Sequence, residues 1–119
     1  MHNEVFSLFE ILEQKNSYLL EFHKINMNEL NRLAEGCTDN LEDFYYSREL
    51  LLDAIHKLDH KIYENSLNKD LKVDKRQKKK LLGLLNLKRK MVMSILDQDL
   101  VILSLVDQIK NGNIKTIAS

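Results

Sequence analysis

Residues 74–111 read DKRQKKKLLGLLNLKRKMVMSILDQDLVILSLVDQIKN, the longest run of helical pattern in the chain. Its apolar residues recur at intervals of three and four, which is the period of an α-helical face. Asp74 is suited to cap the start of a helix, and Gly112 with Asn113 is suited to end it. The stretch therefore predicts a helix over residues 74–111, about 55 Å long at 1.5 Å per residue.

This helix carries apolar residues on more than one side. One set follows a single broad face: Leu81, Leu84, Leu85, Met91, Val92, Ile95, Ile102, Leu105, Val106 and Ile109. A second set lies around the rest of the surface: Leu82, Leu87, Leu96, Leu100, Val101 and Leu103. Two amphipathic helices can cover one side of such a helix but not the whole of it. We therefore expect a fourth helix, a second copy of the chain or a partner to dock there. The alternative is that residues 114–119 fold back as a cover.

Two further helices are predicted upstream. Apolar residues at helical spacing cover residues 3–35 and 41–66, and the turn between them contains Gly36, which suits a left-handed helix end. So short a connection makes the two helices antiparallel neighbours. Polar residues weaken the helical pattern after residue 65, so we place a loop between residues 66 and 74. The end of the chain, residues 112–119, is expected to be a loose tail.

Composition agrees with a helical fold. The chain of 119 residues has no proline and three glycines. Turns are built mainly from those residues, so a chain with few of them must consist of long elements. We expect an all-α protein, an elongated antiparallel three-helix bundle or coiled-coil-like hairpin with a long C-terminal helix, forming one domain over residues 1–119.

Charge divides the chain into two halves. Residues 1–66 hold 13 acids and 6 Lys or Arg, a net charge of −7, whereas residues 67–119 hold 5 acids and 12 Lys or Arg, a net charge of +7. The halves should attract each other if they fold back together. Mutual neutralisation within one bundle and two separate binding faces are both open at this point.

Several features favour a cytoplasmic location. No apolar run approaches the roughly 18 residues of a membrane span. The first residues are acidic where a secretory signal would be basic. Cys37 is the only cysteine, so no internal disulfide can form, which fits a reducing compartment. We expect a cytoplasmic protein with no membrane span.

Catalytic and metal-binding patterns are weak. His56 and His60 share a helical face, but Lys57 stands where a zinc metalloprotease helix needs glutamate. Solvated helix-face residues are the better interpretation of this pair. No glycine-rich loop could cradle a phosphate, and Cys37 has no activating partner visible in the sequence. We expect no enzyme activity, no cofactor and no metal site.

A basic run over residues 69–80 contains seven Lys or Arg. Such a run could hold phosphates and make binding sensitive to salt. However, it lacks the interleaved aromatic residues that stack on bases, and the whole chain has zero net charge. The run therefore favours a solvated helix start that attracts the acidic half over a nucleic-acid surface.

Residues 28–62 read NELNRLAEGCTDNLEDFYYSRELLLDAIHKLDHKI. This stretch resembles the helical hairpin of small flagellar export chaperones of the FlgN/FliT kind, in which a helix ends at a short glycine-containing turn. The next helix of that group begins with an acidic, leucine-containing segment and continues with a charged pair and a leucine run. The later stretch 95–110 resembles that group's last long helix. The lysines at 75–80 have no counterpart there.

This resemblance implies a cytosolic chaperone that binds the helical end of an exported filament or hook-associated subunit. A client helix would lay its apolar face in a groove supplied by the third helix. We expect partner contacts at Leu85, Met91, Val92, Met93, Leu96, Leu100 and Leu103. Each of these residues has ordinary core packing as its alternative, and for Met91 core packing is the better interpretation.

A second function fits the same residues. The heptad-like spacing in all three helices could serve a self-associating coiled-coil module, which would form a homodimer without any client.

Overall fold

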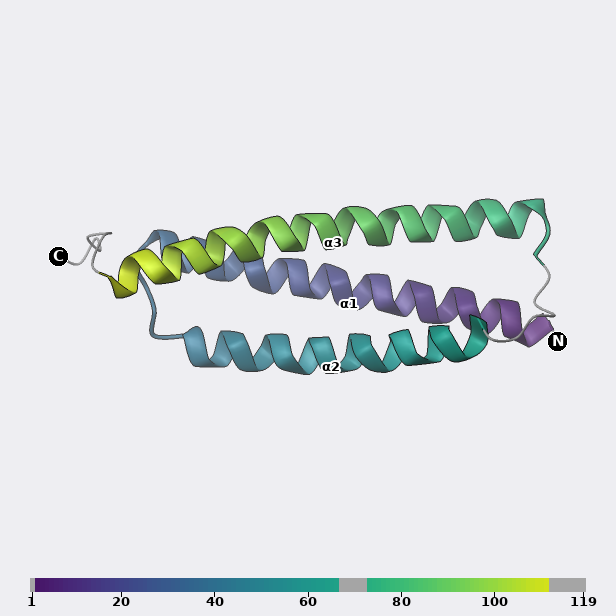
Figure 1. Cartoon of the computed structure of the whole chain (residues 1–119), viewed down its shortest axis with the longest axis horizontal. Helices are drawn as coiled ribbons and strands as arrows, with labels where there is room; N and C mark the ends of the chain where they lie inside the picture. Colours follow the sequence, from purple (N-terminus) through teal and green to yellow (C-terminus); the bar gives the residue numbers. More distant parts are fainter. Residues whose placement is uncertain (1, 67–72, 112–119) are drawn as a thin grey trace.

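The computed structural model describes residues 2–66 and 73–111, with side chains described from residue 8 to 64 and from 73 to 111 (Figure 1). These residues form three helices, α1 (His2–Ala34), α2 (Leu41–Ser66) and α3 (Lys75–Lys110). The prediction of an all-α, elongated bundle is confirmed, and the molecule measures 62 × 23 × 16 Å. Residues 67–72 of the loop predicted between 66 and 74, and the predicted tail at 112–119, lie outside the described residues.

The helix ends follow from local side-chain chemistry. Gly36 closes α1 with a φ of 79°, and its amide donates to the carbonyl of Leu33 at 2.9 Å. Asp74 caps α3, because its carboxylate accepts a hydrogen bond from the Gln77 amide at 2.8 Å. The Gln77 side chain accepts in return from the Asp74 amide at 3.0 Å, which completes a capping box. The predictions for Gly36 and Asp74 are confirmed.

The central feature of the arrangement is that α1 lies between the other two helices (Figure 1). It packs against α2 on one side and against α3 on the other. In the described part of the chain, no Cα atom of α2 lies within 8 Å of one in α3. The bundle is therefore open along the side where α2 and α3 face each other without backbone contact.

Two hydrophobic clusters hold the helices together. The first joins Leu19 and Phe22 of α1 to Ile55 of α2 and Ile95 of α3. The second lies near the end of α1 and contains Leu33, Phe44, Ile102 and Val106. Leu33 and Ile102 are each only 1% exposed. Burial of one such side chain contributes about 2 kcal/mol, so these clusters are the main source of stability.

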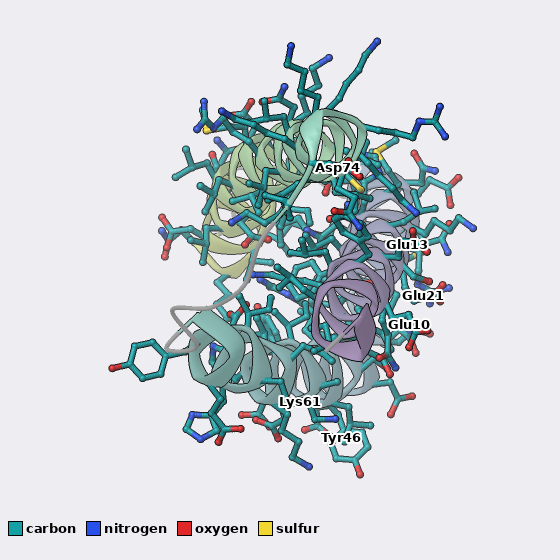
Figure 2. All side chains as sticks on the ribbon, turned by 90° about the vertical axis from the view of Figure 1, so that its right-hand side faces the viewer. Glu10, Glu13, Glu21, Tyr46, Lys61 and Asp74 are labelled. Atoms are coloured by element: carbon teal, nitrogen blue, oxygen red, sulfur yellow. The ribbon has the colours of Figure 1, made fainter. Side chains whose placement is uncertain are left out.

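Charged side chains lie mainly on the outer surfaces. In Figure 2, Glu10, Glu13 and Glu21 point outward from α1, and Lys61 points outward from α2. Between the acidic and basic halves, Lys80 of α3 pairs with Glu13 of α1 at 3.3 Å and lies over the Phe9 ring. Lys15 of α1 pairs with Asp59 of α2. The acidic and basic halves thus meet in at least one direct ion pair, as mutual neutralisation requires.

Candidate functional site

A groove lies between α2 and α3, with α1 as its floor. It encloses about 230 Å³ and has an apolar lining of Leu19, Phe22, Leu52, Ile55, Val92, Ile95 and Leu96. Arg48 of α2 and Asp99 of α3 complete the lining. A second hollow, lined by Tyr45, Arg48, Glu49 and Leu52, continues this surface along α2. We call the two together the α2–α3 groove.

Arg48 is the polar centre of this groove. Its Nη2 lies 3.0 Å from Oδ1 of Asp99, so the pair links α2 to α3. Its guanidinium also lies 5.0 Å from the Phe22 ring centroid and 5.2 Å from that of Phe44. Both rings present their negative faces to the cation. Arg48 is therefore held by residues of all three helices, and its charge is compensated by Asp99 within the groove lining.

A stripe of exposed apolar residues follows α3 beside the groove. Met93 is 57% exposed, Leu96 52%, Leu100 68% and Leu103 62%. Their spacing of three, four and three residues places them on one face, at the positions that meet a partner in a coiled coil. Ile95, Ile102 and Val106 face α1 instead and are buried. We call these four exposed residues the α3 stripe. It adjoins the groove at Leu96.

Polar side chains set the register of α1 against α3. The Asn26 amide donates to Gln98 at 3.2 Å and to the Asp99 carboxylate at 3.0 Å. Gln98 in turn donates to the His23 carbonyl at 3.4 Å. One turn away, His23 Nε2 lies 2.9 Å from the Ser94 hydroxyl. Because a shift of one helix along the other would break these bonds together, they hold the α3 stripe at a fixed place beside the groove.

Glu29 is a buried acid on α1, only 2% exposed. Its Oε2 has no hydrogen-bond partner in the described part of the chain. Burial raises the pKa of Glu29 above its ordinary value of 4.5, the Arg32 charge opposes that rise, and Asp39 adds to it. The raised pKa reflects the cost of keeping a carboxylate charged inside the bundle.

The structure divides the expected partner-contact residues into two groups. Met93, Leu96, Leu100 and Leu103 are exposed and form the α3 stripe. Met91 and Val92 pack against the cluster around Ile95, and Leu85 is half-buried. Val92 and Leu96 also line the groove. Five of the seven expected residues thus lie on the groove or the stripe, and Met91 belongs to the core side of α3.

No family model, curated protein or solved structure matches this chain.

The groove and the α3 stripe are therefore defined by the structure of this chain alone. The α2 side of the groove was not fully predicted from the sequence. In the wall contributed by α2, Arg48 and Leu52 are contacts that the sequence did not predict. A signal for this wall exists: Arg48 interrupts an otherwise apolar series on α2. A charged residue at a core position needs a partner on another helix, and here the partner is Asp99.

The other candidate groups lie apart from the groove lining. His60 is exposed and pairs with Glu64 one turn away at 3.0 Å, and His56 and Cys37 are also exposed. Within residues 2–66 and 73–111, no group of three or more His, Cys, Asp or Glu is arranged to hold a metal ion. Over the same residues, none of the helices has both the length and the apolar content that a membrane crossing requires.

Proposed function

We propose that the chain is a chaperone that binds an amphipathic helix of another protein in the α2–α3 groove. The observation that carries this proposal is the α3 stripe: four large apolar side chains, each more than half exposed, in helical register beside an apolar groove. Surfaces of this kind mark interaction sites in proteins. A helix placed there would make the open three-helix arrangement a four-helix one.

The chemistry of the groove fits a helical occupant. Helix-in-groove recognition uses apolar anchors at spacings of three and four residues, which matches the spacing of the α3 stripe. Leu52 and Tyr45 on α2 offer contacts on the opposite wall, and both are exposed. Burial of four stripe residues would contribute several kcal/mol at about 2 kcal/mol each, before the cost of association. Affinities in the micromolar range are therefore within reach.

The resemblance to flagellar export chaperones supplies the class of client. On that basis, the client is the helical end of an exported filament or hook-associated subunit, and the chaperone acts in the cytoplasm without catalysis. Covering the apolar face of the client's helix would keep that subunit soluble and competent for secretion. The adaptable side chain of Met93 would suit clients whose contact residues differ in shape.

The experiment uses peptides as probes. A fluorescent peptide from the helical C-terminal end of a filament-type subunit would be titrated with the purified chain, and anisotropy would report binding. We expect saturable binding that falls at least tenfold with Leu96→Asp, because that residue lines both the groove and the stripe. Leu52→Asp should weaken binding from the opposite wall.

Val101→Asp is the matched control. Val101 is also apolar and exposed on α3, but it lies on another face of the helix. Binding should be unchanged in this variant, and a peptide with the same composition but no apolar face should not bind. Equal affinity for the Leu96→Asp variant and the unmodified chain would rule out the groove as the binding site. Absence of binding to any filament-type or hook-associated peptide would rule out this class of client.

A further inference from the structure

The α3 stripe and its two flanking charges have a symmetric spacing. In order along α3 they are Arg89, Met93, Leu96, Leu100, Leu103 and Asp107, separated by four, three, four, three and four residues. The same intervals occur when the series is read backwards. All six are exposed. The four apolar residues lie at the centre, with a cation at one end and an anion at the other.

We propose that a second copy of this chain docks on the stripe, with α3 against α3 in antiparallel orientation. The two-fold axis would pass beside residue 98. Met93 would then oppose Leu103 of the second copy, and Leu96 would oppose Leu100. Both pairs occur twice, as a two-fold symmetric interface requires. The contact would extend over about 27 Å of helix at 1.5 Å per residue.

Charge complementarity selects this orientation. In the same register, Arg89 faces Asp107 of the second copy at both ends of the contact. The wider distribution agrees: residues 75–90 hold eight Lys or Arg and no acid, whereas residues 91–110 hold three Asp and one Lys. An antiparallel pair places the basic part of one helix beside the acidic part of the other. A parallel pair would place like charges side by side, including Arg89 against Arg89.

Two pairs of like charges flank the axis in this register, Asp97 with Asp97 and Asp99 with Asp99 of the second copy. Asp99 is already paired with Arg48, so Asp97 makes the unfavourable contact. Asp97 flanks the stripe close to the axis, so the two copies of Asp97 would approach each other. Asp97 is exposed, and water screens this repulsion. The like-charge pair lowers the affinity of the dimer without changing its register. Replacement of Asp97 by asparagine should therefore tighten the dimer.

The dimer and the client would share Leu96, Leu100 and Leu103. A second copy would cover the stripe while no client is bound, and client binding would release it. The dimer itself does not depend on the proposed function, because its contacts come from this chain alone. A chain that dimerises but binds no flagellar peptide would refute only the proposed function.

Sedimentation equilibrium of the full chain over a wide concentration range tests the dimer. We expect the unmodified chain to dimerise reversibly. Arg89→Glu and Asp107→Arg should each weaken the dimer about tenfold, because both ends of the contact change from attraction to repulsion. An equimolar mixture of these two variants should regain the original affinity, since each mixed pair restores opposite charges at both ends.

Variants at two neighbouring residues distinguish loss of the dimer contact from loss of the folded structure. Leu100→Glu should abolish dimerisation, whereas Val101→Glu, one position along and on another face, should leave it intact. Circular dichroism should show the same helical content for both. Asp97→Asn should increase the association constant.

Three results would overturn the proposal. A strictly monomeric chain at the highest concentration would do so directly. A dimer that tightens with the neutral substitution Arg89→Gln would indicate a parallel pair, because that change removes a contact between like charges, whereas in the antiparallel pair it removes an attraction to Asp107. A mixture of Arg89→Glu and Asp107→Arg that dimerises no better than either variant alone would show that the two residues do not meet.

Discussion

Arg48 on α2 and Asp99 on α3 form an ion pair, with 3.0 Å between Nη2 and Oδ1, although no described Cα atoms of those helices lie within 8 Å of each other. Asp99 also accepts a hydrogen bond from Asn26 on α1 at 3.0 Å. A single carboxylate therefore joins all three helices. Both members of the pair are mostly buried, with side chains 19% and 25% exposed, so this contact is screened less than a surface ion pair.

Loss of the Asp99 charge should destabilise the bundle. Asp99→Asn leaves the Arg48 guanidinium largely buried without a counter-charge, so we expect the free energy of unfolding to fall by about 2 kcal/mol. Urea denaturation followed by circular dichroism would measure this. The double variant Arg48→Met with Asp99→Asn should recover part of the loss, because it removes the uncompensated cation. Unchanged stability in Asp99→Asn would show that the pair contributes nothing.

Loss of the Asn26 side chain should destabilise the bundle through lost hydrogen bonds rather than through an unpaired charge. It is fully buried, and its amide is a hydrogen-bond donor to both Gln98 and Asp99. Asn26→Ala leaves those acceptors without their partner and creates a small void, so we expect a loss of about 2–3 kcal/mol in the free energy of unfolding. Asn31→Ala, an exposed residue on the same helix, is the control and should change stability by less than about 0.5 kcal/mol.

The raised pKa of Glu29 predicts that the free energy of unfolding depends on pH. Because burial raises its pKa in the folded state, the folded chain binds this proton more tightly than the unfolded chain does. Its contribution therefore becomes more favourable as pH falls from neutral through the raised pKa towards the ordinary value of 4.5. At neutral pH the charged carboxylate is destabilising. Glu29→Gln should raise the melting temperature at pH 7 and remove this part of the pH dependence.

Thermal unfolding at several pH values between 7 and 4.5 would measure the effect of Glu29. Glu21→Gln is the matched control, since Glu21 is exposed on the same helix and points outward (Figure 2). It should leave the melting temperature nearly unchanged. If Glu29→Gln melts at a lower temperature than the unmodified chain at pH 7, the charged carboxylate has a stabilising contact that outweighs its burial.

Much of the fold could be predicted from the sequence because the signals are local. Gly36 and Asp74 mark helix ends through their own backbone and side-chain preferences, and the structure confirms both. The period of the apolar residues identified three helices. These features depend on residues close together in the chain, so they need no knowledge of the tertiary arrangement.

The faces by which the helices pack against one another could not be predicted from local signals. Spacing alone shows that α3 is apolar on several sides, but not which side meets α1. That choice depends on pairs distant in sequence, such as Asn26 with Gln98, 72 residues apart. Val92 is an example: its spacing predicts a partner contact, and the structure packs it against the core cluster around Ile95. Arg48 in the α2 wall of the groove was missed because it finds its partner on another helix.

The central position of α1 has a mechanical consequence. Since no described Cα atom of α2 lies within 8 Å of one in α3, side chains alone connect these two helices, in the two shared hydrophobic clusters and in the ion pair of Arg48 and Asp99. Between the two outer backbones, that ion pair is a restraint on the separation of α2 and α3. Side chains change rotamer more readily than packed backbones shift, so we expect the width between α2 and α3 to adjust to small or bulky side chains of an incoming helix.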